Sequence, residues 1–123
     1  MPPRRRTDPA GGESALTAWL SDPDAVDRTT LATVVRFTLE ELGARAPGRS
    51  VEVRVPPFGA DQCIEGTTHR RGTPPNVVET DPETWLAVAT GRMRWATAWE
   101  SGRLQVSGTR ADLAAYLPLA GVL

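Results

Sequence analysis

The chain has 123 residues, 40% of them hydrophobic, and its 14 basic and 15 acidic side chains leave a formal net charge of −1. This length and composition predict one globular domain with a single modest core. They argue against a stable membrane insertion, because no run approaches the roughly 20 apolar residues of a spanning helix. They also argue against a nucleic-acid partner, which would call for a basic face.

The N-terminal region is polar and contains the triplet Arg4-Arg5-Arg6 with no apolar run behind it, so a secretory signal is not predicted. The single cysteine, Cys63, excludes an internal disulfide and fits a reducing compartment. We therefore expect a cytoplasmic protein with a disordered tail over residues 1–13 and a single domain over residues 14–123. The arginine triplet is either a solvated part of that tail or a contact for a phosphate or an anionic lipid head.

Two helices are expected in the N-terminal third. Residues 14–20 form a short one, and a longer one runs to about residue 42 with Asp27 or Thr29 as its N-cap. The longer helix carries a regular apolar stripe, and Phe37 is expected at the edge of the core.

Residues 51–55 are the clearest strand, since three valines alternate with Glu52 and Arg54 and so point to one face. A turn at residues 56–59 and a second strand at residues 62–65 complete a hairpin. The loop over residues 66–75 is long enough to border a binding site.

The C-terminal third begins with a strand near Asn76. Asp81 and Pro82 start a helix that ends at Gly91, and a second helix covers residues 94–101 before Gly102. A strand follows at residues 104–107, and then a closing amphipathic helix that starts at Thr109 and Asp112 and ends before Pro118. Strands and helices do not alternate strictly, which favours an α+β fold with an antiparallel or mixed sheet of four to five strands covered by helices.

The C-terminal third contains a recognisable series of motifs. It begins with the acidic helix start Thr80-Asp81-Pro82-Glu83-Thr84-Trp85-Leu86 and a glycine five residues after Leu86, and it continues in the pattern Trp95-x-x-x-Trp99-x-x-Gly102-x-Leu104-x-Val106-x-Gly108. With these motifs, residues 76–119 resemble the sterol carrier protein family, and in particular its short actinobacterial members. Residues 28–75 match only loosely.

The resemblance implies a non-enzymatic carrier that holds a lipid or other hydrophobic small molecule between its sheet and its helices. By that likeness, the pocket lining is Trp85, Leu86, Leu104, Val106, Leu113 and Leu117, faced by Val53 and Val55. The alternative is that these side chains and the four tryptophans simply fill the core. The domain would then be an interaction module, as a homodimer or beside an enzyme.

Other chemistry is poorly supported by the sequence. Cys63 and His69 are the only residues of their types and could form a thiolate–imidazole pair, but a lone cysteine in a strand is more often a small buried hydrophobe. One histidine and one cysteine do not make a metal site, and no dinucleotide or phosphate-loop motif occurs. We therefore expect no catalytic residues, no metal and no cofactor.

Overall fold

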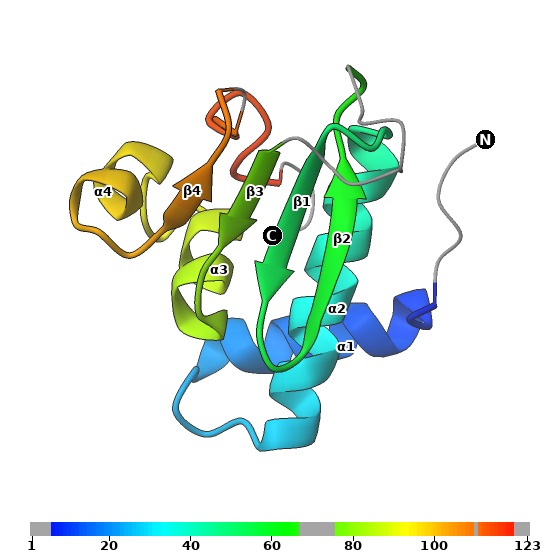
Figure 1. Cartoon of the computed structure of the whole chain (residues 1–123). Coiled ribbons are helices and arrows are strands. Elements are labelled where there is room, and N and C mark those ends of the chain that lie inside the picture. Colours follow the sequence, from blue (N-terminus) through cyan, green and yellow to red (C-terminus); the bar gives the residue numbers. More distant parts are fainter. Residues whose placement is uncertain (1–5, 67–75, 110, 120–123) are drawn as a thin grey trace.

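In the computed structural model, which describes residues 6–66, 76–109 and 111–119, a four-stranded sheet is covered on one face by helices (Figure 1). The strand order is β2-β1-β3-β4. The strands are β1 (Val51–Val55), β2 (Gly59–Cys63), β3 (Asn76–Glu79) and β4 (Gln105–Ser107). The central pair β1–β3 is parallel and the two outer pairs are antiparallel, so the predicted mixed α+β fold is confirmed.

The helices are α1 (Pro9–Ser21), α2 (Arg28–Arg45), α3 (Pro82–Ala89) and α4 (Trp95–Glu100). Helices α2 and α3 lie behind the sheet, α1 crosses behind α2, and α4 lies beyond the β4 edge (Figure 1). None of the described helices combines the length and the apolar character needed to cross a membrane.

Local chemistry sets the helix starts as predicted. Asp27, rather than Thr29, caps α2 by accepting from the Thr30 amide at 2.7 Å. Asp81 caps α3 by accepting from the Thr84 amide at 2.8 Å, with Pro82 in the first helical turn. Gly91 ends α3 at φ 82°, a conformation that favours glycine.

One face of the sheet supplies the floor of the core. Val53, Val78 and Val106 are neighbours across β1, β3 and β4, and the alternation of the strands turns all three toward the helices. Val51, Val53 and Val55 are fully buried, as their spacing predicts. Asp61 of β2 continues the same row, because it is the partner of Val53.

The N-terminal helix begins earlier than the sequence predicts. Residues 9–13, which we expected to be disordered, form the first turns of α1, with Asp8 as the N-cap. The reason is a close approach between helices: Gly12 is buried, and a Cβ at this position would lie 2.3 Å from the Phe37 ring. Phe37 is therefore in the core, only 4% exposed, and not at its edge.

The second strand is also displaced. It covers β2 rather than residues 62–65, and Ile64 leaves it with φ 66°. This shift places Gly59, Asp61 and Cys63 on the helix-facing side.

The predicted closing helix is wrong. The described residues 111–119 form turns, in which Asp112 accepts from the Ala114 amide instead of capping a helix that starts at Thr109. Leu113 and Leu117 are still buried, and the Leu119 amide donates to the Ala89 carbonyl at 2.9 Å. Docking against the end of α3 thus takes the place of helix formation.

Candidate functional site

The eight side chains expected to line a pocket all belong to the hydrophobic core or pack against it. Trp85, Leu86, Val53, Val55, Leu113 and Leu117 are buried, whereas Leu104 and Val106 are partly exposed. They come from both sides of the core, since β1 and β4 supply the floor and α3 packs over it. The sequence therefore identified side chains that share one apolar cluster.

The Trp85 indole is fixed within this cluster. Its Nε1 donates to Thr38 Oγ1 at 2.8 Å, and Thr38 Oγ1 itself donates to the Val34 carbonyl at 2.8 Å. Both side chains are buried, so the bond joins α3 to α2 in a place with little access to water.

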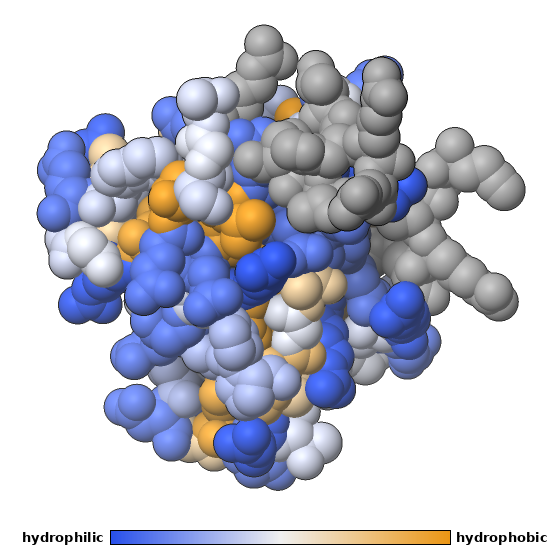
Figure 2. Space-filling model, viewed as in Figure 1, coloured by the Kyte–Doolittle hydropathy of each residue, from blue (hydrophilic) through white to orange (hydrophobic). Residues whose placement is uncertain are grey.

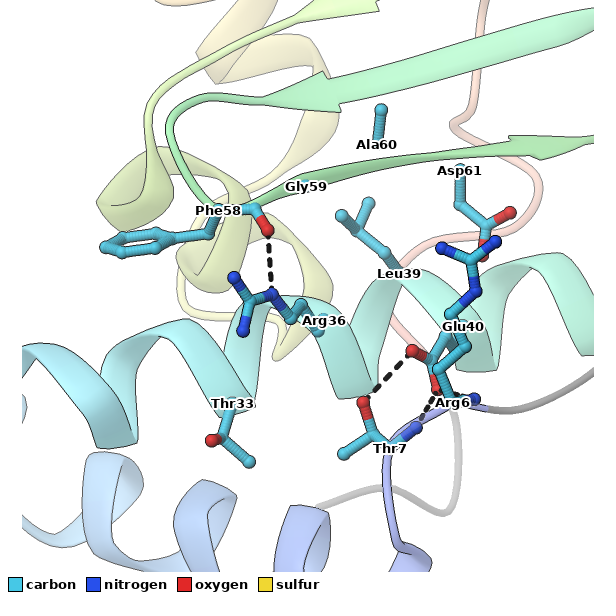
Figure 3. A pocket seen from close by; sticks show the side chains of 10 residues that line it. All are labelled: Arg6, Thr7, Thr33, Arg36, Leu39, Glu40, Phe58, Gly59, Ala60 and Asp61. Atoms are coloured by element: carbon cyan, nitrogen blue, oxygen red, sulfur yellow. Dashed lines mark hydrogen bonds between the residues drawn. The ribbon is translucent and has the colours of Figure 1, made fainter.

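A cleft of about 1090 Å³ opens at another place, between α2, β2 and the segment that precedes α1 (Figure 3). None of the eight predicted residues lines it. Its lining residues are Arg6, Thr7, Thr33, Arg36, Leu39, Glu40, Phe58, Gly59, Ala60 and Asp61.

The floor of the cleft is connected to the core. Leu39 and Phe58 are only 2% and 8% exposed, and both belong to the buried cluster while also lining the cleft. Gly59 leaves the floor accessible, because a Cβ there would sit 3.6 Å from Arg36 Cγ and 3.8 Å from Leu39 Cδ1. The cleft is thus the place where the apolar interior reaches a polar surface.

The rim of the cleft carries both signs of charge. Arg36 Nε donates to the Phe58 carbonyl at 2.8 Å, which holds this guanidinium at one side. Glu40 holds the opposite side by accepting from the Arg6 amide at 3.1 Å, the Thr7 amide at 2.9 Å and the Thr7 hydroxyl at 3.0 Å. These three bonds fasten the segment before α1 onto α2.

Asp61 is the titratable group whose environment is most relevant to the cleft. Its burial raises the pKa of the carboxyl, and the nearby Glu40 charge raises it further, whereas the Gln62 amide and the Arg6 charge lower it. Figure 3 shows the Arg6 guanidinium beside Asp61. The cleft therefore offers hydrogen-bond donors on arginine together with a carboxyl that is protonated more easily than usual.

Cys63 does not have the properties of a nucleophile. It is 1% exposed, and burial, with a smaller effect from Asp61, raises the pKa of its thiol to about 12. Since the thiolate is the reactive form, this environment suppresses thiol chemistry. The other half of the considered pair, His69, lies outside the described residues.

Within the described residues, no three His, Cys, Asp or Glu side chains come together as a metal site would require. The carboxylates of the cleft, Glu40 and Asp61, are engaged by amides of the chain itself.

Sequence reasoning missed the cleft residues. Asp61 lay outside the expected strand, and Glu40 carries no local signal, because its partners Arg6 and Thr7 lie 34 and 33 positions away in the chain. A strand placed at residues 59–63 would have revealed an acid pointing inward at Asp61, which is the signal that a polar site interrupts a core face.

Residues 27–119 match a protein family described as bacterial SCP ortholog, where SCP stands for sterol carrier protein. The matched region includes α2, the whole sheet, α3, α4 and the buried turns up to Leu119. No curated protein matches the chain.

Proposed function

Because the chain belongs to the bacterial family of sterol carrier protein orthologs, we propose that it binds a lipid or another hydrophobic small molecule without acting as an enzyme. Family membership is the observation that carries this proposal. It is supported by the apolar cluster between sheet and helices, to which all eight expected lining residues contribute.

The cleft supplies the entrance in this proposal. An amphipathic ligand places its polar head at the rim, where Arg36 and Arg6 donate and the Asp61 carboxyl either accepts or, once protonated, donates. Its apolar tail passes over Leu39 and Phe58 into the interior that includes Val53, Val106 and Leu86. Small-molecule sites commonly combine an apolar lining with a few polar anchors of this kind.

Entry of the tail requires the core side chains to move apart. Leu104 and Val106 at the β4 end are the least buried of the eight expected lining residues. The tail of the proposed ligand therefore replaces contacts between core side chains rather than displacing water. Its binding should change the environment of the Trp85 indole.

Two positions of β2 give a matched test. Gly59→Leu places a side chain over Leu39 on the floor of the cleft, because a Cβ at Gly59 already lies in van der Waals contact with Leu39. Gln62→Leu is the control, since Gln62 does not line the cleft and lies on the opposite face of the sheet, as the partner of Glu52. Both substitutions add a leucine to the same strand.

Binding is measured with cis-parinaric acid, a fluorescent fatty acid that accepts energy from tryptophan. We expect saturable binding to the wild-type chain, about fivefold or more weakening in Gly59→Leu, and a change of less than about twofold in Gln62→Leu. Absence of saturable binding by the wild type, for this probe and for a sterol probe, would favour the interaction module with a filled core. A mass in solution that rises with concentration would then identify a homodimer.

A further inference from the structure

The short helix α4 and its two flanking turns form a surface that differs from the rest of the chain. Here it is called the α4 surface and comprises Arg92, Met93, Arg94, Ala96, Trp99 and Arg103. Helix α4 lies at the outer edge of the sheet, beyond β4 (Figure 1). It is joined to the body by the Met93 amide, which donates to the Ala87 carbonyl at 3.0 Å, and by Thr80 Oγ1, which donates to the Arg103 carbonyl at 2.9 Å.

Trp99 is the main exposed apolar group of this surface. It is 44% exposed, an unusual degree for the largest side chain. Its ring meets the Trp95 ring edge to face, with centroids 5.8 Å apart. A pair of indoles thus extends from the core to the outside of the molecule.

The indole of Trp95, the inner ring of this pair, contains a buried hydrogen-bond donor. Trp95 is 8% exposed, and among the described residues its buried Nε1 has no hydrogen-bond acceptor. A buried donor without an acceptor is unfavourable, so an acceptor from outside the chain that reached this N–H would remove that cost. Ester carbonyl and phosphate oxygens of a lipid are acceptors of this kind.

The charge around the two indoles is positive. Residues 91–104 contain three arginines and one acid, Glu100, whereas the whole chain has a formal net charge of −1. Arg94 and Arg103 are both exposed and stand at the two ends of the six-residue helix. Arg92 is engaged with the body, since it donates to the Leu20 carbonyl and lies over the Trp19 ring.

We propose that the α4 surface docks on anionic lipid bilayers, with Trp99 inserted at the interface and Arg94 and Arg103 against the lipid phosphates. Tryptophan is enriched at membrane interfaces because its ring is apolar and its N–H is polar. Exposed arginines beside it add attraction to an anionic surface. Figure 2 shows a hydrophobic area over the upper ends of β3 and β4, which continues the apolar character toward the sheet.

This inference extends the proposed function, because a protein that binds lipid needs a place to meet the membrane. The two proposals are nevertheless separable. The cleft lies against β2 and the α4 surface beside β4, at opposite edges of the sheet.

The test uses the full chain and vesicles of phosphatidylcholine with or without phosphatidylglycerol. We expect flotation with the anionic vesicles at low salt, less at high salt, and little with the neutral ones. Vesicles with brominated acyl chains should quench part of the tryptophan emission, and this quenching should be lost in Trp99→Phe.

A charge-matched pair of variants locates the surface. Arg94→Gln combined with Arg103→Gln should weaken anionic vesicle binding about tenfold or more. Arg45→Gln combined with Arg49→Gln removes the same charge from the end of α2 and the turn after it, and should change binding by less than about twofold.

Equal loss in both double variants, or flotation without Trp99 quenching, overturns the proposal. So does burial of Trp99 in a concentration-dependent dimer without vesicle binding, which would make the surface a protein contact. Binding of cis-parinaric acid is measured on the same variants without vesicles. Retained fatty-acid binding with no flotation removes this inference alone, whereas flotation without fatty-acid binding removes the proposed function alone.

Discussion

Trp85 Nε1 donates to Thr38 Oγ1 at 2.8 Å, and this bond links two buried side chains that lie 47 positions apart in the chain. It ties α3 to α2 across the apolar cluster that is the proposed ligand interior. A buried donor that loses its acceptor bears the full cost of its desolvation. The bond therefore offers a direct probe of how tightly this interior is closed.

Thr38→Val keeps the shape of the side chain and removes the acceptor. We expect the free energy of unfolding to fall by about 1–3 kcal/mol, measured by urea denaturation. Thr33→Val is the control on the same helix, because Thr33 is half-buried and its hydroxyl donates only to the Thr29 carbonyl at 3.0 Å. An equal loss in the two variants would mean that the indole bond contributes nothing of its own.

Gly12 and Gly11 give a second matched pair. A Cβ at Gly12 would lie 2.3 Å from Cδ1 of Phe37, so Gly12→Ala should lower the free energy of unfolding by about 1–3 kcal/mol through overpacking. At Gly11 the nearest atom is Asp8 Oδ2 at 3.3 Å, and Gly11→Ala gains up to about 1 kcal/mol of helix propensity against this contact.

The companion substitution Phe37→Leu should recover part of the loss in Gly12→Ala, since it removes the atoms that clash. Thermal or urea unfolding of the single and double variants measures the coupling. Additive losses would show that α1 and α2 separate freely and that the close approach is not what holds them.

The sequence predicts those parts of this fold that depend on neighbouring residues. The caps at Asp27 and Asp81 and the alternation of valines in β1 each report a local rule, and the structure confirms them. The prediction of a closing helix failed because a helix of about nine residues is only marginally stable by itself. Docking of Leu113, Leu117 and Leu119 into the core decided its conformation.

The cleft could not be predicted from local sequence rules for a related reason. Glu40 and Asp61 come from α2 and β2, and they approach one another only after the register of β2 places Asp61 on the inner face. A shift of one residue in that register would turn Asp61 to the other side of the sheet. The segment at Arg6 and Thr7 joins them through its hydrogen bonds to Glu40 and through the Arg6 charge near Asp61.

Two carboxyls should give opposite dependences of stability on pH. The pKa of Asp61 is raised by burial and by Glu40, so the folded state binds its proton more tightly than the unfolded state. Its contribution to stability is therefore present at low pH and is lost as the pH rises above the ordinary carboxyl value of 3.8 through the raised one. Asp61→Asn, which keeps an acceptor for the Gln62 amide, should be relatively more stable at pH 7 than at pH 3.

Asp27 provides the opposite case on the surface of the molecule. The Thr30 backbone amide, followed by the Thr30 side chain, lowers the pKa of Asp27, so its contribution is present above 3.8 and is lost as the pH falls through the lowered value. Relative to the wild type, Asp27→Asn should be less stable at neutral pH, and this difference should disappear in acid. Asp61→Asn should be more stable than the wild type at neutral pH, and that difference should also disappear in acid. Urea denaturation at several pH values measures both, and slopes of the same sign in the two variants would contradict the assignment.

Cys63 should react only when the chain opens. Burial, and secondarily Asp61, raise the pKa of its thiol to about 12, so almost no thiolate is present at pH 8 in the folded state. We expect slow labelling by iodoacetamide in buffer and fast labelling in urea, followed by mass spectrometry. Because Cys63 neighbours Asp61 on the inner side of β2, saturation with a fatty acid should slow the labelling further if the ligand stabilises the folded state. Faster labelling with the ligand present would mean instead that the ligand opens the β2 edge, and the tail would then have to lie beside Cys63 rather than toward β4.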